Sequence, residues 1–552
     1  MNKYLRYNTL FKACKVILGF AIFFIVQENV YGQTPTFVTK PNILWLVAED
    51  ISPYISSYGD STAKTPNLDR LAREGVRYTR VFSVSGVCAP SRSCLITGMY
   101  PTGVGTNNMR TLNTLPNVGF SKYSVVLPPK VKMFSELMRI GGYYCTNNSK
   151  QDYQFEAPRS GWDESSGKAH WRNKPKGKPF FAVFNMTVTH ESQIWEKKND
   201  PLLVDPAAVP VPPYYPESPV IRKDVARMYS NIMEMDKEVG ELLKQLEEDG
   251  LLDKTIIVWY SDNGGPLPRG KREIYDSGLH VPMLIRFPQK QFAATVNDQL
   301  ISFVDFAPTT LSLAGIQIPT YMQGHAFLGK SKSQTPRKYI YAARDRMDSE
   351  YDMVRAVRDE RFKYIKNFQP EKPYIQNIIY RKQMNLMNEL ISFEKAGNLN
   401  GIQQLWFRKS KDVEELYDTK NDPFELNNII HDPKYISNLT ELRNKLIEWM
   451  AFTNDKGFIP EKEWIASFWP NMVQPLTKVP KISVKKGLVH LSSETDGASL
   501  SYKIIKDNEA ENKLGWQVYS KPVKLNTGDK IIVVADRIGY KGSNTTEFTN
   551  KL

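Results

Sequence analysis

Three short apolar segments constrain most strongly what this chain can fold into. They span residues 42–48, 180–186 and 255–260. Nearly continuous apolar runs of this length are typical of parallel strands that are buried on both faces. Stretches with helical character lie between them, at residues 67–74, 132–140 and 224–246. Strands that alternate with helices predict a large α/β domain.

Polar residues follow each predicted strand. Glu49 and Asp50 stand directly after the first, His190 comes shortly after the second, and Asp262 and Asn263 follow the third. Ligands bind at the carboxyl edge of a parallel sheet. We therefore expect a functional site at that edge.

The chain has 552 residues, which is more than one ordinary compact domain. Residues 345–475 are richer in aromatic and charged residues and end in a helical stretch at 439–450, which indicates a smaller α+β subdomain. Short strand patterns follow, at residues 482–484, 500–505, 516–519 and 530–535, and predict a small β-sandwich. We expect a signal peptide at 1–32, a catalytic α/β domain at 33–344, the subdomain at 345–475 and the sandwich at 476–552.

The first residues have the pattern of a secretory signal. A basic start that includes Lys3, Arg6 and Lys15 precedes an apolar run at 16–26. This run is too short to span a bilayer comfortably, and no second candidate follows. We predict cleavage near Gly32 and a secreted, periplasmic or cell-surface protein without a stable membrane span; an uncleaved anchor is the alternative.

The number of cysteines limits the disulfides that the chain can form. Cleavage leaves Cys88, Cys94 and Cys145, an odd and sparse set that cannot form a disulfide framework. At least one should be free or chemically altered.

The formal net charge of +14 suits a polyanion, and for an exported protein an acidic polysaccharide or a membrane surface fits better than nucleic acid. A solvated lysine-rich surface is the alternative.

Residues 88–98, CAPSRSCLITG, form the most specific motif. They match every fixed position of C-x-P-S-R-x-x-L-x-T-G. The segment resembles the signature of the type I, formylglycine-dependent sulfatases. Cys88 could otherwise be a buried core cysteine, or form a disulfide or zinc pair with Cys94.

The resemblance implies an alkaline-phosphatase-like sulfatase fold, with a large mixed sheet flanked by helices. It also implies that a formylglycine-generating or sulfatase-maturating enzyme oxidises Cys88 to formylglycine (3-oxoalanine). The hydrated aldehyde has two hydroxyls, so one can attack sulfur and the other can later expel sulfate. A serine or an unmodified thiol lacks that exit.

The family's metal ligands correspond to residues at the strand ends and to Cys88 itself. A divalent cation lowers the cost of attacking an anionic sulfate, and Ca²⁺ suits carboxylate and amide oxygens. The implied ligands are Glu49, Asp50, Cys88, Asp262 and Asn263. This sequence departs from the family in that Glu49 stands where an aspartate is usual.

Other site residues follow from the same resemblance. Arg92 looks like the residue that holds the formylglycine hydroxyl and the carboxylates, and Lys271 resembles the lysine that binds a sulfate oxygen. His190 resembles the histidine beside the leaving-group oxygen. Lys150 occupies the place of a family lysine, and Asp152 replaces the histidine that normally follows two residues later.

The spacing around Lys271 is closer to the heparan N-sulfatase branch than to the arylsulfatases, and the last domain resembles a chitobiase C-terminal-type sandwich. Arginine forks match sulfate or uronate groups, so Arg344, Asp345 and Arg346, with Asp152, are candidates for substrate binding. A surface ion-pair network is the alternative for the arginine cluster.

We therefore predict a sulfuric ester hydrolase that acts on a sulfated polysaccharide or its oligosaccharides, with an algal polysaccharide such as ulvan favoured. An N-sulfoglucosamine (heparan-type) sulfohydrolase is the closest alternative. A phosphatase or phosphonate hydrolase of the same superfold, and a catalytically silent glycan-binding protein, are the others.

Overall fold

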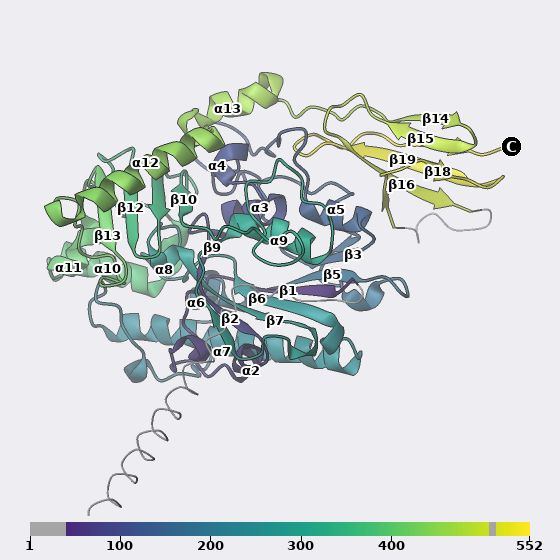
Figure 1. Cartoon of the computed structure of the whole chain (residues 1–552). Coiled ribbons are helices and arrows are strands. Elements are labelled where there is room, and N and C mark those ends of the chain that lie inside the picture. Colours follow the sequence, from purple (N-terminus) through teal and green to yellow (C-terminus); the bar gives the residue numbers. More distant parts are fainter. Residues whose placement is uncertain (1–39, 507–514, 552) are drawn as a thin grey trace, which may run out of the picture. The chain divides into compact units, whose positions relative to one another are not determined.

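The computed structural model describes residues 40–506 and 515–551, and the predicted signal peptide lies outside them. A mixed sheet of nine strands forms its centre (Figure 1). β1 (Asn42–Ala48) lies between β5 (Phe180–Met186) and β6 (Thr255–Ser261) and pairs with both in parallel. The strands expected from the three apolar runs are confirmed, and they are neighbours.

The other strands extend this sheet on both sides. Beyond β5 lie β3 (Tyr144–Asn148) and β4 (Glu164–Ser165), and beyond β6 lie β7 (His280–Arg286), β2 (Val76–Phe82), β8 (Thr295–Asn297) and β9 (Ile301–Ser302). β7 runs antiparallel to both β6 and β2. The sheet is therefore mixed, as the resemblance implies.

Alternate residues of β1 face two separate cores. Ile43, Trp45 and Val47 pack in a core that includes residues of α3 (Cys88–Thr97), α5 (Phe134–Ile140) and α9 (Phe306–Leu313). Leu44, Leu46 and Ala48 pack in another, with residues of α2 (Pro66–Glu74) and α7 (Pro219–Glu248). Successive side chains of a strand point to opposite faces, so helices on both faces require an apolar strand without alternation.

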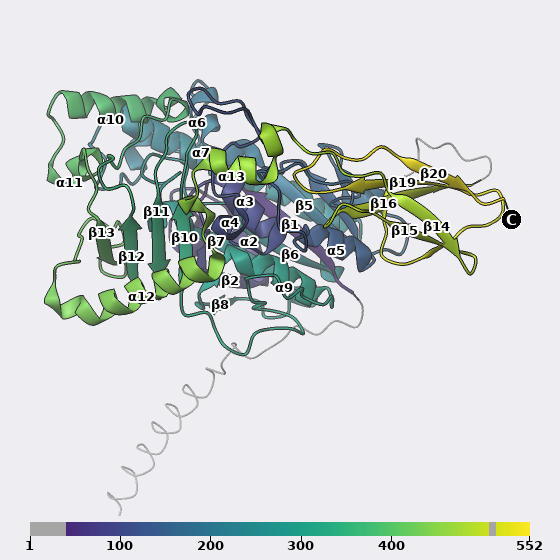
Figure 2. The same cartoon turned by 90° about the horizontal axis from the view of Figure 1, so that it is seen from above.

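A second, antiparallel sheet follows in the chain. It consists of β10 (Ile340–Arg344), β11 (Val354–Arg358), β12 (Phe362–Asn367) and β13 (Glu414–Asp418). α12 (Ile436–Thr453), the helix expected at 439–450, lies along it (Figure 2). The remaining α-helices among the described residues are α4 (Pro101–Val104), α6 (Ser192–Glu196), α8 (Asp276–Leu279), α10 (Asn385–Lys395), α11 (Gly401–Gln404) and α13 (Glu461–Phe468).

The last part of the chain forms two small antiparallel sheets. One contains β14 (Lys481–Lys485), β15 (Leu488–Ser492) and β18 (Val523–Lys524); the other contains β16 (Ser499–Ile505), β17 (Gln517–Val518), β19 (Lys530–Asp536) and β20 (Thr546–Thr549). Val489, Leu491, Ile531 and Val533 are among the side chains packed between them. Lys132 Nζ donates to Ser499 Oγ at 3.0 Å, and Arg159 pairs with Asp536 at 2.6 Å, so polar contacts join these sheets to the first domain.

Within the residues that the structure describes, no helix is both long and apolar enough to cross a membrane. The three boundaries between the predicted parts stay predictions, and the second sheet begins at Ile340, slightly before the predicted start of the subdomain.

Candidate active site

The loops after β1 and β6 meet at the carboxyl edge of the sheet. The Asp262 amide donates to the Ala48 carbonyl at 3.0 Å, and the Asp50 amide donates to Asp262 Oδ1 at 3.3 Å. Asn263 Nδ2 donates to Asp50 Oδ1 at 2.9 Å. Glu49, Asp50, Asp262 and Asn263 are all almost completely buried. The structure thus brings the two strand-end pairs together, as the sequence predicts.

Cys88 is the first residue of α3 and is buried at 2% exposure beside Met109 and Met347. Burial raises the pKa of its thiol to about 12, although Lys150 and Lys271 oppose the shift. An unmodified Cys88 is therefore protonated at neutral pH, and a thiol is a much weaker nucleophile than a thiolate. Cys88 and Cys94 are both free, which excludes the disulfide alternative, and Cys94 packs in the core.

Arg92, one turn along α3, links the two strand-end pairs. Its Nε donates to Asp262 Oδ2 at 2.8 Å, and its Nη2 lies 3.5 Å from Glu49 Oε1. Nη1 donates to Asn185 Oδ1 at 2.6 Å. Burial disfavours the charged guanidinium, but Asp262 and Glu49 outweigh it and raise the Arg92 pKa. Arg92 contacts the carboxylates that the resemblance assigns to it.

Two lysines complete the charge pattern. Lys271 is 1% exposed, and its Nζ donates to both oxygens of Asp50, at 2.6 and 2.5 Å. Lys150 Nζ donates to Glu49 Oε2 at 2.9 Å and lies 3.4 Å from Asp152 Oδ2. Burial raises the pKa of Asp152, but Lys150 and Arg92 more than offset it, so the Asp152 pKa is lowered and this residue stays a carboxylate.

His190 follows β5 after a single 3₁₀ turn, Thr187–Thr189. Its Nδ1 accepts from the Ser192 amide at 3.2 Å. Burial, followed by the charges of Lys271 and Lys150, lowers the His190 pKa to about 2. The ring is therefore neutral at ordinary pH, and because Nδ1 is an acceptor, Nε2 carries the proton and can donate it in a hydrogen bond.

A buried ion pair beside these residues was not predicted from the sequence. The Glu191 carboxylate accepts from Arg272 Nη1 and Nη2 at 2.7 and 2.6 Å, and the Glu191 amide donates to Asp50 Oδ2 at 2.7 Å. Burial raises the Glu191 pKa, but Arg272 and then Lys271 outweigh it and hold that pKa well below its usual value. The only sequence signal is that these residues are adjacent to His190 and Lys271.

Comparison with known proteins supports the same family. A family model described as Sulfatase matches residues 41–316. An "Ulvan-active sulfatase" of Formosa agariphila is 46% identical, with 92% of this chain and 91% of that protein covered. The chain belongs to the sulfatase family.

Other similarities of this sulfatase agree. A model described as "N-sulphoglucosamine sulphohydrolase, C-terminal" matches residues 269–395. The human N-sulphoglucosamine sulphohydrolase is 24% identical, with 75% of this chain and 90% of that protein covered. A solved structure of a protein in complex with its substrate D-glucosamine-2-N,6-O-disulfate superimposes with a TM-score of 0.56 at 20% identity, over 77% of this chain and 100% of that one. The sulfatase has the alkaline-phosphatase-like fold and is a sulfuric ester hydrolase.

The polar atoms at the strand ends of the sulfatase suit a hard cation. Asn263 Oδ1 is buried and accepts no hydrogen bond, and Glu49 Oε1 accepts none either, although Arg92 Nη2 lies 3.5 Å from it. Buried oxygens without a hydrogen bond are rare in a protein interior, and oxygen is the ligand type that Ca²⁺ prefers. Among residues 40–506 and 515–551, no group of three or more His, Cys, Asp or Glu side chains is arranged to hold a metal. A cation at this site would therefore also need a ligand of another type, such as the amide oxygen of Asn263.

The predicted substrate-binding cluster is a network of buried ion pairs. Arg344 Nη1 donates to Asp352 Oδ2 at 2.5 Å. Arg346 Nε and Nη2 each donate to Glu461 at 2.7 Å. Asp345 Oδ1 accepts from an arginine of β11, and all three members of the cluster are at most 4% exposed. Both guanidinium forks already bind carboxylates, which favours the ion-pair alternative, although the network is buried rather than on the surface.

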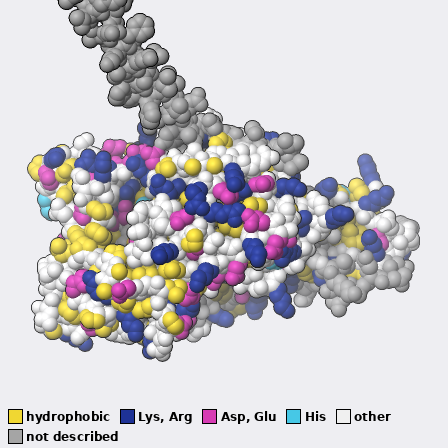
Figure 3. All heavy atoms as spheres, turned by 90° about the horizontal axis from the view of Figure 1, so that it is seen from below, with side chains coloured by type: hydrophobic (Ala, Val, Ile, Leu, Met, Phe, Trp, Pro, Cys, Tyr) yellow, Lys and Arg dark blue, Asp and Glu magenta, His cyan; other side chains and the backbone are white. Residues whose placement is uncertain are grey.

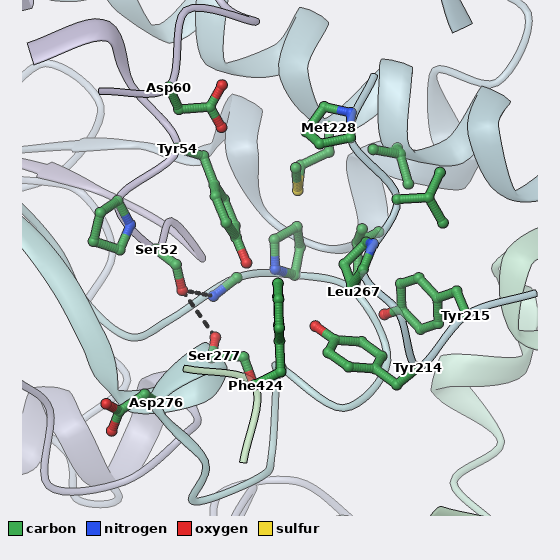
Figure 4. Close-up of a pocket in the computed structure, with 18 of the residues that line it drawn as sticks. Ser52, Tyr54, Asp60, Tyr214, Tyr215, Met228, Leu267, Asp276, Ser277 and Phe424 are labelled. Carbon is green, nitrogen blue, oxygen red and sulfur yellow. Dashed lines mark hydrogen bonds between the residues drawn. The ribbon is translucent and has the colours of Figure 1, made fainter. Parts of the chain in front are cut away.

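A cavity of about 340 Å³ lies behind the loops of the site, with Tyr54, Tyr214 and Phe424 in its wall (Figure 4). At its edge, Ser52 Oγ donates to the Ser277 carbonyl at 2.9 Å and accepts from the Gly265 amide at 3.0 Å. Ser52 therefore ties the loop that carries Asp50 to the loop that carries Lys271.

Proposed function

We propose that this sulfatase hydrolyses sulfate esters of a sulfated algal polysaccharide such as ulvan, or of its oligosaccharides, with formylglycine at position 88 and Ca²⁺. The observation that carries the substrate is the 46% identity to an ulvan-active sulfatase over nearly the whole chain. The contacts around Cys88, described above, support the chemistry.

When formed, formylglycine supplies a nucleophilic hydroxyl, and Ca²⁺ supplies positive charge for the sulfate oxygens. Glu49, Asp50, Asp262 and Asn263, together with residue 88, would hold the cation. The buried oxygens of Glu49 and Asn263 that accept no hydrogen bond support this assignment.

The basic side chains of the site and His190 supply the other interactions with the substrate and the carboxylates. Lys150 and Lys271 place positive charge near position 88, which offsets the repulsion between a nucleophile and an anionic ester. Neutral His190 donates a hydrogen bond through Nε2 to the oxygen of the departing sugar. Arg92 contacts Asp262 and Glu49 and so holds the carboxylates of both strand ends in position.

We also propose that the protein is exported after cleavage near Gly32, to the periplasm, the cell surface or the medium. It would meet a formylglycine-generating or sulfatase-maturating enzyme during its synthesis, since position 88 becomes nearly inaccessible once folded.

One other function is favoured by a specific observation. The match of residues 269–395 to the C-terminal part of an N-sulphoglucosamine sulphohydrolase supports cleavage of N-sulfate. Sulfate release from ulvan oligosaccharides and from N-sulfated glucosamine oligosaccharides, measured side by side, separates the two. We expect release from the first; release from the second alone would replace our substrate with the heparan type.

A further inference from the structure

A second cavity, of about 560 Å³, is lined by none of the residues assigned to sulfate cleavage. Its wall includes Asp345 and Arg346, the loop around Lys456 and Phe458, and Trp464 of α13. Lys456, Phe458 and Trp464 lie beyond both matched family regions, which end at residues 316 and 395. We propose that this cavity binds an acidic sugar unit of the polysaccharide, an inference that rests on the proposed polysaccharide substrate.

Each acidic residue that lines this cavity has a basic partner. Glu461 accepts from Arg346 in two contacts of 2.7 Å, and Asp352 pairs with Lys411 at 2.9 Å. Asp345 lies 3.0 Å from Arg355, an arginine that it shares with Asp455.

Two lysines at the cavity differ in this respect. Lys456 and Lys462 form no salt bridge with an acidic side chain among the described residues. Lys456 Nζ instead lies 5.7 Å from the centroid of the Trp464 ring. Two ammonium groups without an acidic partner favour an anionic ligand.

The lining also offers apolar surface to a sugar ring. Phe458 is 53% exposed and Tyr351 is 37% exposed, and such rings present apolar surface to the C–H face of a pyranose.

The cavity adjoins the site around Cys88 along the chain. Asn108 and Arg346 line it, and the next residues, Met109 and Met347, pack against Cys88. The Met109 amide donates to the Arg346 carbonyl at 2.9 Å, so the two segments are joined at this point. A sugar unit held here would raise the local concentration of the same polymer near position 88.

The test uses the full mature chain and a desulfated, uronate-containing ulvan oligosaccharide, with calorimetry as the readout. This probe carries no sulfate ester, so turnover does not affect the result. We compare the wild type with Lys456→Ala/Lys462→Ala, whose side chains are partly or fully exposed. The matched control is Lys395→Ala/Lys420→Ala, which removes the same charge from exposed positions. Phe458→Ala is a second variant that leaves the charge unchanged.

We expect the wild type and the control pair to bind equally, the cavity pair at least about tenfold more weakly, and Phe458→Ala several-fold more weakly. Sulfate release from a sulfated monosaccharide should be unchanged in the cavity pair, with unchanged thermal unfolding. No binding by the wild type, or equal binding by cavity and control pairs, would overturn the proposal. If the probe binds as expected but ulvan releases no sulfate, the proposed substrate fails and the cavity assignment stands.

Discussion

At the scale of single residues, the site depends on groups whose protonation is set by burial. The Cys88 thiol has a pKa of about 12 and His190 a pKa of about 2, so neither is charged near pH 7. The charged groups around them, such as Arg92 and Lys271, are paired with carboxylates. The unmodified thiol is therefore a weak nucleophile near pH 7, which supports the proposed conversion to formylglycine.

Cys88→Ser tests the need for that conversion. We expect sulfate release to fall by at least about a thousandfold, because a serine hydroxyl cannot form the hydrate. The thermal unfolding midpoint should change little, since the substitution replaces one sulfur by oxygen at a small side chain. Turnover near the wild-type rate in this variant would contradict the formylglycine mechanism.

Removal of Ca²⁺ with a chelator should stop turnover, and added Ca²⁺ should restore it. Asn263→Ala and Asp262→Ala should raise the Ca²⁺ concentration needed for half-maximal activity more than Glu49→Ala does, because Glu49 stands at a position where the family uses a shorter side chain. The measurement is activity against buffered free Ca²⁺. Full activity after exhaustive chelation would show that the metal assignment is wrong.

At the scale of helices and strands, α7 and α10 meet at a buried carboxyl group. Asp224 of α7 accepts from the Leu386 amide of α10 at 2.6 Å and is 4% exposed. Burial raises the Asp224 pKa to about 6, from an ordinary value near 4. The folded state therefore holds this proton more tightly than the unfolded state does, and its stabilising effect is lost as pH rises through about 6.

Asp224→Asn should keep the accepting oxygen and remove the ionisation. We expect little change in stability at pH 4 and a gain at pH 8 of up to about 3 kcal/mol, the value of a pKa difference of about two pH units. Chemical unfolding of both proteins at the two pH values measures this. An equal effect at both values would mean that Asp224 does not titrate as argued.

The same scale shows what the sequence can predict. β1 and β5 lie at the predicted residues because continuous apolar runs are a direct signature of strands buried on both faces. α3 was not predicted as a helix: all of its residues are buried, so it lacks the polar face from which amphipathic periodicity is recognised. The Glu191–Arg272 pair was missed because nothing local distinguishes a buried ion pair from two surface charges.

At the scale of the whole molecule, positive charge is the property most relevant to a polymeric anion. The net charge is +14, and Figure 3 shows Lys and Arg side chains across one face, interspersed with acidic ones. Such a surface attracts a polyanion more strongly than a single charged sugar, and salt screens that attraction over about 8–10 Å.

The KM for ulvan oligosaccharides should therefore rise with added NaCl more steeply than the KM for a sulfated monosaccharide. Initial rates at 50 and 500 mM NaCl, roughly a threefold difference in screening length, are sufficient. A matched rise for both substrates would mean that only the contacts around position 88, and not the wider surface, attract the substrate.

The central claim is tested most directly by the mass of the tryptic peptide that contains residue 88, from protein produced together with a maturating enzyme. Our account predicts a peptide that is lighter than the thiol form by the mass difference between –CH₂SH and –CHO. The fraction of peptide in this lighter form should be proportional to the specific activity of each preparation. Fully active protein whose peptide carries only an unmodified cysteine would contradict it.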